Sequence, residues 1–236
     1  MSADQDRLPA TSSPADVEAF LRDLHQAPAV RPGGGHGRLI FALDATASRE
    51  PTWDRACRIQ GEMFEATAAL GGLDVRLLFY RGFAECRASR WMRNAAELHR
   101  AMRAVFCLGG ETQIERVLSH AIVESKKQRV NALVFVGDAM EENADRLCQL
   151  AGELGLLGTP VFVFHEGRDA VAAAAFRQIA KLSRGAYLSF DMASADRLKE
   201  LLASVAVYAA GGYRALAAYG AQKGGDIRLL TAQLRG

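Results

Sequence analysis

The chain has 236 residues, of which half are hydrophobic, and its 29 basic residues nearly balance its 27 acidic ones. A chain of this length and composition can bury one large α/β core or two small ones. The formal net charge of +2 argues against a polyanion-binding surface spread over the whole protein. We therefore do not expect nucleic acid as a partner.

The cysteines and the N-terminus both bear on the cellular compartment. Cys57, Cys86, Cys107 and Cys148 form no Cys-x-x-Cys pair, so we expect buried free thiols and a reducing compartment. The first six residues are acidic and polar, where a secretion signal would be basic and then apolar. No apolar run approaches the ~20 residues that span a bilayer. The sequence therefore predicts a cytoplasmic protein without a membrane partner.

The two ends of the chain differ in composition from its middle. Residues 1–37 begin with Pro and Ser and end in Pro32-Gly33-Gly34-Gly35, which predicts an N-terminal arm with a short amphipathic helix. The apolar stripe of that helix consists of Val17, Phe20, Leu21 and Leu24. We expect the helix to pack on its own domain, and docking on a partner is the alternative. Residues 38–210 are predicted to form an α/β domain, and residues 211–236 a C-terminal tail that wraps the domain or is mobile.

Within the middle segment, short apolar runs rich in Val and Phe alternate with stretches of helical period. The predicted strands are Arg38–Leu43, Asp74–Tyr80, Ala132–Gly137, Val161–His165 and Ala186–Phe190. Continuous apolar runs are typical of strands that helices cover on both faces, as in parallel sheets. The pattern therefore predicts a Rossmann-like, doubly wound α/β fold with a mostly parallel sheet.

Helices are predicted between these strands because apolar residues recur there at helical spacing. The apolar stripes cover residues 56–67, 114–122, 144–154, 171–179 and 198–205. An antiparallel edge strand at Glu85–Trp91 and a helix at Ala95–Val105 are expected to interrupt the regular alternation. Arg100 and Arg103 lie opposite the apolar stripe of that helix, so we interpret them as a solvated face and not as a phosphate-binding patch.

Oxygen-bearing side chains follow two predicted strands and occupy one loop. Asp44-Ala45-Thr46-Ala47-Ser48 follows the first strand, Asp138 follows the run Leu133–Gly137, and Thr112 lies in a Gly-containing loop before a helix. In an open parallel sheet, ligands bind outside the carboxyl ends of the strands, so these groups should converge. Carboxylate and hydroxyl oxygens are ligands that Mg²⁺ and Mn²⁺ prefer.

This arrangement resembles the von Willebrand factor A (VWA) domain with its metal-ion-dependent adhesion site (MIDAS). The motif of that family is Asp-x-Ser-x-Ser after the first strand, a Thr in a Gly-containing loop before a helix, and an Asp after the fourth strand. In this chain Thr46 replaces the first Ser, and Ala139 stands after Asp138 where the family commonly has Gly. The resemblance extends over Leu39–Val207 and leaves out both ends of the chain.

The resemblance implies a set of metal ligands. The hydroxyls of Thr46 and Ser48 would bind Mg²⁺ or Mn²⁺ directly, and Thr112 would join them in a ligand-bound state. Asp44 and Asp138 would act on the ion directly or through water. The methyl group of Thr46 adds bulk to a crowded loop, and loss of a Gly after Asp138 would weaken the site if a positive φ is needed there.

The resemblance also implies a function. Family members of this type are metal-dependent protein-binding modules and not enzymes. Neutral hydroxyls and water leave the cation incompletely neutralised, so it attracts an Asp or Glu side chain of a protein partner. Stand-alone cytoplasmic members are commonly linked to ATP-driven assemblies, so the resemblance suggests an AAA+ ATPase as that partner.

An enzymatic alternative remains open. In a haloacid-dehalogenase-like phosphohydrolase, Asp44 would be the nucleophile and Asp138 would help to hold Mg²⁺. That class usually has a second Asp as general acid where this chain has Thr46, and without an acid the leaving group is not protonated. Lys126 and Lys127, the nearest candidates to balance charge, are expected to point away from the site.

A metal-free structural scaffold is the other alternative, because each of these residues could serve as a helix cap. Asp44 and Ser48 could cap the helix that follows the first strand, and Thr112 is an ordinary N-cap for the helix after it. Asp138 could cap a helix entered at Met140. Their joint occurrence at one sheet edge is what the metal site explains better.

Overall fold

The computed structural model describes residues 36–50, 72–190, 195–223 and 225–234. Its strands are β1 (Gly37–Asp44), β2 (Leu73–Arg81), β3 (Glu85–Met92), β4 (Ala132–Gly137), β5 (Val161–Glu166) and β6 (Ala186–Phe190). They form a six-stranded sheet in the order β3-β2-β1-β4-β5-β6. All neighbours are parallel except β2 and β3, which are antiparallel. The predicted fold class is therefore confirmed, including the antiparallel edge strand.

The bounds of every predicted strand agree with the structure to within one residue. The reason is visible in β1, where all eight residues are buried because helices cover both faces of the sheet. Such strands carry an uninterrupted apolar signal in the sequence. The predicted arm helix at residues 17–24 and the predicted helix at residues 56–67 lie outside the described residues.

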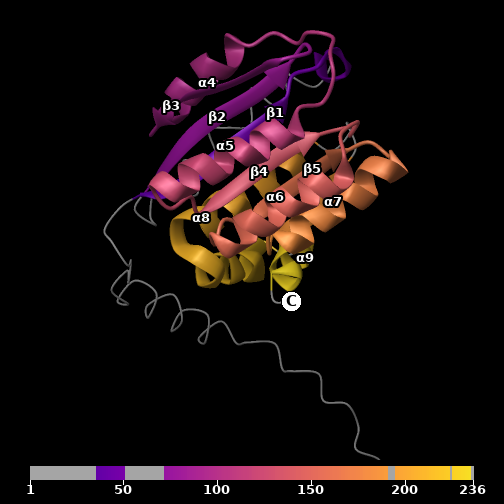
Figure 1. Cartoon of the computed structure of the whole chain (residues 1–236). Coiled ribbons are helices and arrows are strands. Elements are labelled where there is room, and N and C mark those ends of the chain that lie inside the picture. The colour runs from indigo at the N-terminus through magenta and orange to yellow at the C-terminus, as the bar shows by residue number, and fades with distance from the viewer. Residues whose placement is uncertain (1–35, 51–71, 191–194, 224, 235–236) are drawn as a thin grey trace, which may run out of the picture. The chain divides into compact units, whose positions relative to one another are not determined.

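Helices cover the two faces of the sheet (Figure 1). They are α4 (Ala95–Arg103), α5 (Ile114–Lys127), α6 (Ala144–Leu156), α7 (Ala170–Leu182), α8 (Ala195–Lys223) and α9 (Gly225–Gln233). Alternate residues of β1 point to opposite faces: Ile40 packs with the buried sides of α5, α6 and α7, and Leu39 with those of α4, α8 and α9. Two buried layers thus hold the strand ends rigidly in place.

Helix α8 passes through residue 210, where the sequence predicted a domain boundary. It bends at Gly212, whose φ of 73° is outside the helical range, and Leu216 beyond the bend is fully buried. By length and composition, Glu200–Gln222 could cross a membrane, although the sequence predicted no segment of this kind. More than half of its apolar window is buried, with Leu201 and Val205 in the core, so packing on the sheet accounts for its apolar character.

Helix α4 and the cysteines test two smaller predictions. Arg100 and Arg103 are exposed, while Met102 is fully buried, so the solvated face is confirmed. Cys86 and Cys148 carry free thiols, but they are half-buried and not buried as expected. Cys86 lies on the edge strand β3. Burial still raises the pKa of the Cys86 thiol to about 11.

Candidate functional site

The carboxylate of Asp44 organises the end of β1. It is 1% exposed, and its Oδ1 accepts a hydrogen bond from the backbone N–H of Thr46 at 2.7 Å. Its Oδ2 accepts one from the phenol of Tyr80 at 2.9 Å. The pairing of β1 with β2 sets Asp44 opposite Tyr80, so the sheet register makes this contact. Both carboxylate oxygens are therefore engaged within the protein, and the role of Tyr80 was not foreseen from the sequence.

The same burial shifts the proton affinities of both groups. Desolvation raises the pKa of Asp44 above its ordinary value, the hydrogen bonds from Thr46 lower it, and the charge of Asp138 raises it again. Desolvation and the neighbouring Asp44 charge raise the pKa of Tyr80 well above its ordinary value. The phenol is therefore a permanent donor to Asp44.

Because the pKa of Asp44 is raised in the folded state, we expect the stability of the metal-free protein to depend on pH. The folded chain binds the Asp44 proton more tightly than the unfolded chain does, so protonation of Asp44 contributes to the free energy of unfolding. This contribution is fully present below the unfolded pKa of about 3.9 and is lost as the pH rises through the folded pKa. Urea unfolding of the metal-free wild type and of Asp44→Asn, from about pH 4 to about pH 7.5, measures it. The stability of the wild type relative to the variant should fall with rising pH; a difference that is constant over this range would contradict the assignment.

Thr46 and Ser48 place two hydroxyls side by side. They flank Ala47 at the start of the short 3₁₀ helix η1 (Ala47–Arg49), and Thr46 Oγ1 lies 3.1 Å from Ser48 Oγ. Adjacent ligands of an octahedral cation with bonds of about 2.0 to 2.1 Å are about 3 Å apart, so this spacing fits. Thr46 is the N-cap residue of η1 but makes no capping bond with its side chain. The capping alternative for Asp44 and Ser48 concerned the helix predicted at residues 56–67, which lies outside the described residues.

Backbone contacts bring the loop that carries Thr112 to the end of β1. The N–H of Leu108 donates to the carbonyl of Ala45 at 3.0 Å, and the N–H of Glu111 donates to that of Gly82 at 3.3 Å. A side chain at Gly110 would collide with the backbone of Gly82, so only glycine permits this approach. Gly110 thus permits the placement of the loop on the β2–β3 turn.

Thr112 is tied to the segment that follows β4. Its hydroxyl accepts from the N–H of Glu141 at 3.1 Å, and its own N–H donates to the Glu141 carboxylate at 3.0 Å. The N-cap position of α5 belongs to Gln113, so the interpretation of Thr112 as the helix cap is wrong. The reciprocal bonds instead join the two loops on which the predicted site depends.

The N-terminus of α5 is capped by Glu142 from that other loop. The Glu142 carboxylate accepts from the N–H groups of Ile114 at 2.6 Å and Glu115 at 2.7 Å. Helix α6 begins only at Ala144, with Asn143 as its N-cap, so the alternative in which Asp138 caps a helix entered at Met140 is also wrong. In this loop the Glu142 carboxylate instead stabilises the free N–H groups and the positive dipole end of α5.

We expect Glu142→Ala to lower the free energy of unfolding by about 1 to 2 kcal/mol, because it removes both capping bonds and the charge at the helix N-terminus. Urea unfolding followed by circular dichroism measures the change. Glu115→Ala is the matched control, since its carboxylate lies in the same helical turn and makes only a half-exposed ion pair with Arg146. Equal effects of the two substitutions would contradict the capping role.

Asp138 presents a buried, unsatisfied oxygen. Its Oδ1 is shielded from solvent and accepts no hydrogen bond from any described residue. Ala139, the departure from the family pattern, does not adopt a positive φ, because Arg184 is the only non-glycine residue that does so in the described ranges. A glycine is therefore not needed after Asp138 in this loop. A buried carboxylate oxygen without a donor is the kind of group that a cation would satisfy.

His165 holds the backbone of Asp138 in position. Its Nε2 lies 3.3 Å from the carbonyl oxygen of Asp138, and its Nδ1 lies 2.9 Å from the hydroxyl of Tyr187. A carbonyl can only accept, so Nε2 carries the proton and Nδ1 accepts from Tyr187. Burial lowers the pKa of His165, which favours this neutral form. The only pointer in the sequence was that His165 ends a strand at this edge.

An ion pair next to Ser48 was also missed by sequence reasoning. Arg49 pairs with Glu166 at the end of β5, and both side chains are buried. Burial lowers the pKa of Arg49, while the charges of Asp138 and Asp44 raise it. A single Arg after a Ser and a single Glu after a strand carry no signal for pairing, because the contact depends on the fold.

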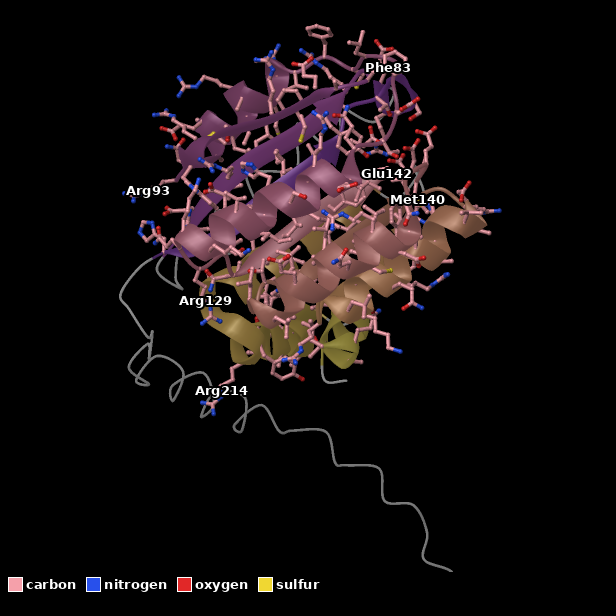
Figure 2. All side chains as sticks on the ribbon, in the orientation of Figure 1. Phe83, Arg93, Arg129, Met140, Glu142 and Arg214 are labelled. Carbon is pink, nitrogen blue, oxygen red and sulfur yellow. The ribbon has the colours of Figure 1, made fainter. Side chains whose placement is uncertain are left out.

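The structure thus brings the segment with Asp44, Thr46 and Ser48, the loop with Thr112, and Asp138 to the carboxyl ends of the parallel strands. Figure 2 labels Met140 and Glu142 at this end of the molecule, with Phe83 nearby and Arg129 at the far end. No group of three or more His, Cys, Asp or Glu residues in the described ranges is arranged to hold a metal. The hydroxyls would therefore be essential ligands, and metal binding by these residues stays a prediction.

Comparisons with known proteins concern the fold. No family model and no curated protein matches the chain. Among solved structures it is similar to the VWA domain of SpRpn10, with a TM-score of 0.56 and 13% identity over 75% of this chain and 98% of that one. It is also similar to proximal thread matrix protein 1 (PTMP1) from the mussel byssus, with a TM-score of 0.56 and 16% identity over 75% of this chain and 46% of that one.

Two further structures agree. A PTMP1 structure described as having a zinc-occupied MIDAS motif matches with a TM-score of 0.55 and 16% identity over 75% of this chain and 46% of that one. The pilus adhesin SpaC from Lactobacillus rhamnosus GG matches with a TM-score of 0.57 and 11% identity over 76% of this chain and 30% of that one. The chain thus spans less than half of PTMP1 and SpaC and nearly all of the SpRpn10 domain. The protein therefore has the fold of a von Willebrand factor A domain.

Proposed function

We propose that this protein is a VWA-type binding module that captures an acidic side chain of a protein partner through Mg²⁺ or Mn²⁺. The observation that carries the proposal is the unsatisfied buried Oδ1 of Asp138 at the same sheet edge as the adjacent hydroxyls of Thr46 and Ser48. The zinc-occupied MIDAS motif described for PTMP1 supports the use of a divalent metal on this fold.

Each residue of the site would have a distinct role. The hydroxyls of Thr46 and Ser48 would ligate the cation, and Thr112, whose hydroxyl accepts only the Glu141 N–H, would join them. Asp138 would contribute negative charge. Asp44, with both oxygens engaged, would hold Thr46 in place. A bound divalent cation would offer an open coordination position to a carboxylate, because neutral hydroxyls do not neutralise it.

Exposed apolar side chains beside the site support a protein as the partner. Phe83 is 76% exposed, Phe106 63% and Leu108 46%. They belong to the β2–β3 turn and to the loop that carries Thr112. The two segments are joined by a hydrogen bond of 3.4 Å from the N–H of Gly82 to the carbonyl of Leu108. Arg81 stacks on Phe106 at 4.0 Å from the ring centroid. Aromatic side chains and arginine gathered at one place are typical of interfaces between proteins.

The partner class rests on the family resemblance alone. Stand-alone cytoplasmic members of the family are commonly linked to AAA+ ATPases, and we extend that link to this chain. Neither nucleic acid nor a membrane forms part of it. The near balance of basic and acidic residues supports the first of these exclusions.

The surroundings of Asp44 favour a non-enzymatic role. A nucleophilic carboxylate needs an accessible oxygen, but Asp44 is 1% exposed and both of its oxygens accept hydrogen bonds. Thr46 cannot replace the general acid of a phosphohydrolase, because a hydroxyl is too weak an acid for that role. The metal-free scaffold is also less well supported, since Thr112 and Asp138 cap no helix.

Calorimetric titration with Mn²⁺ tests the proposal. The wild type should bind, and Ser48→Ala and Thr46→Val should bind about tenfold or more weakly, because each loses one ligand oxygen. Ser125→Ala is the matched control: its hydroxyl pairs with Thr159 near the opposite end of α5. Wild-type binding no tighter than that of Ser48→Ala would refute the metal site.

A further inference from the structure

A buried ion pair adjoins the proposed metal site. Arg49 directly follows Ser48 in η1, and its guanidinium contacts the carboxylate of Glu166. The two side chains are only 4% and 6% exposed, respectively. Taking two charges out of water is unfavourable, and pairs at such depth are weak devices for stability alone. We therefore expect this pair to have a role other than stability.

Glu166 lies beside the predicted ligands. Gly137 is opposite His165 in the pairing of β4 and β5. The next residue of each segment is Asp138, directly after β4, and Glu166, the last residue of β5, so the two lie at the same edge of the sheet. The charges of Asp138 and Asp44 both act on Arg49. The ends of β1, β4 and β5 thus carry three carboxylates, one of which pairs with Arg49, and together these four groups have an excess of two negative charges, the charge that one divalent cation balances.

The pairing determines which groups remain available to a cation. Mg²⁺ and Mn²⁺ prefer carboxylate oxygens, and a carboxylate from the same chain would bind with less loss of entropy than one from a partner. An unpaired Glu166 would be such a ligand, next to Asp138. Because Glu166 pairs with Arg49, its carboxylate is not available to the cation.

We propose that Arg49 is a positioning residue that withholds Glu166 from the cation, lowers the affinity of the site for metal, and thereby keeps a coordination position open for the partner's carboxylate. This inference rests on the proposed metal-dependent function. It assigns to the residue after the Ser48 ligand a role in partner capture, although Arg49 itself would touch neither the cation nor the partner.

The test compares Mn²⁺ affinities, measured by calorimetry, among four proteins. Arg49→Gln should bind Mn²⁺ about tenfold more tightly than the wild type, because a positive charge is removed and Glu166 is released. Glu166→Gln should bind about tenfold more weakly, because the Arg49 charge is then opposed only by Asp138 and Asp44. The double variant, which keeps the net charge, should resemble the wild type. A purely structural pair would weaken binding in both single variants or change neither.

A second readout follows water on the bound ion. Proton relaxation of solvent by protein-bound Mn²⁺ reports exchangeable water, and it should be lower in Arg49→Gln, where Glu166 displaces a water molecule. Acetate, used as a probe carboxylate, should lower the relaxation of the wild type and leave that of Arg49→Gln unchanged. Arg49→Lys, which keeps the charge, should behave as the wild type does. If Arg49→Gln does not fold, the opposite expectations for Glu166→Gln and the double variant decide the matter.

The outcomes separate this inference from the proposed function. Equal Mn²⁺ affinity of the wild type and Arg49→Gln would overturn the role of Arg49 and leave the metal site standing. Binding by Arg49→Gln alone would overturn metal use by the natural chain and support the role of Arg49. Absence of binding in every protein would overturn both.

Discussion

The affinity for Mn²⁺ is expected to fall about a hundredfold when Asp138 is replaced by asparagine. The substitution keeps the shape of the side chain but removes the charge of a carboxylate whose buried Oδ1 has no donor among the described residues. In the absence of metal the melting temperature should change little. Loss of the charge relieves the repulsion of Asp44 but also weakens the attraction for Arg49, and these effects oppose each other.

Calorimetry with Mn²⁺ and a thermal melt of each protein check this expectation. Asp145→Asn is the matched control, because Asp145 is an exposed carboxylate in the first turn of α6. It changes the net charge by the same amount as Asp138→Asn does. A similar loss of affinity in the control would show that total charge and not the site is responsible. A large drop in the metal-free melting temperature of Asp138→Asn would show that this residue is mainly structural.

Tyr80→Phe is expected to lower the free energy of unfolding by about 2 to 3 kcal/mol, because it removes a hydrogen bond to a buried charged group and leaves Asp44 Oδ2 without this donor. For a chain of this size, the melting temperature should fall by about 5 to 10 °C. Ring stacking on Phe135, with centroids 6.4 Å apart, is retained in the variant, so the loss isolates the hydroxyl.

A double-mutant cycle with Asp44→Asn measures the coupling between the two groups. The cost of Tyr80→Phe should be clearly smaller in the Asp44→Asn background, where no buried negative charge depends on the phenol. Thermal and urea unfolding provide both values. An equal cost in the two backgrounds would mean that the hydroxyl acts independently of Asp44, contrary to the geometry.

Tyr80 and His165 contact two of the predicted ligands from neighbouring strands. Tyr80 fixes the carboxylate of Asp44 from β2, and His165 fixes the backbone of Asp138 from β5. Both are buried and rigidly packed, the latter against Phe176 at 5.2 Å between centroids. Such partners set the orientation of ligating groups, so their loss affects a metal site as strongly as the loss of some ligands.

The sequence alone was sufficient for the strands and for placing the candidate residues at one edge of the sheet. Strands such as β1 are buried on both faces, so their apolar character is continuous and visible without the fold. The order of Asp44, Thr112 and Asp138 along the chain was enough to place them at one sheet edge, because the carboxyl ends of parallel strands share an edge.

The capping interpretations of Thr112 and Asp138 are wrong, because in the structure other residues cap these two helices. Thr112 directly precedes α5, yet the cap of that helix is Glu142, which is 28 residues from Ile114 along the chain. Asp138 is close to α6 in sequence but leaves the capping to Asn143. Local propensity cannot reveal a carboxylate that reaches a helix from another loop.

The sequence by itself therefore determined what depends on local periodicity: the strands, the parallel sheet and the set of oxygen donors at its edge. Only the tertiary structure decided how these donors are used. The pairing of β1 with β2 sets Tyr80 opposite Asp44, and the packing of η1 near the end of β5 lets Arg49 pair with Glu166. Such contacts join residues far apart in the chain, and their geometry exists only once the sheet register and the packing of the loops are established.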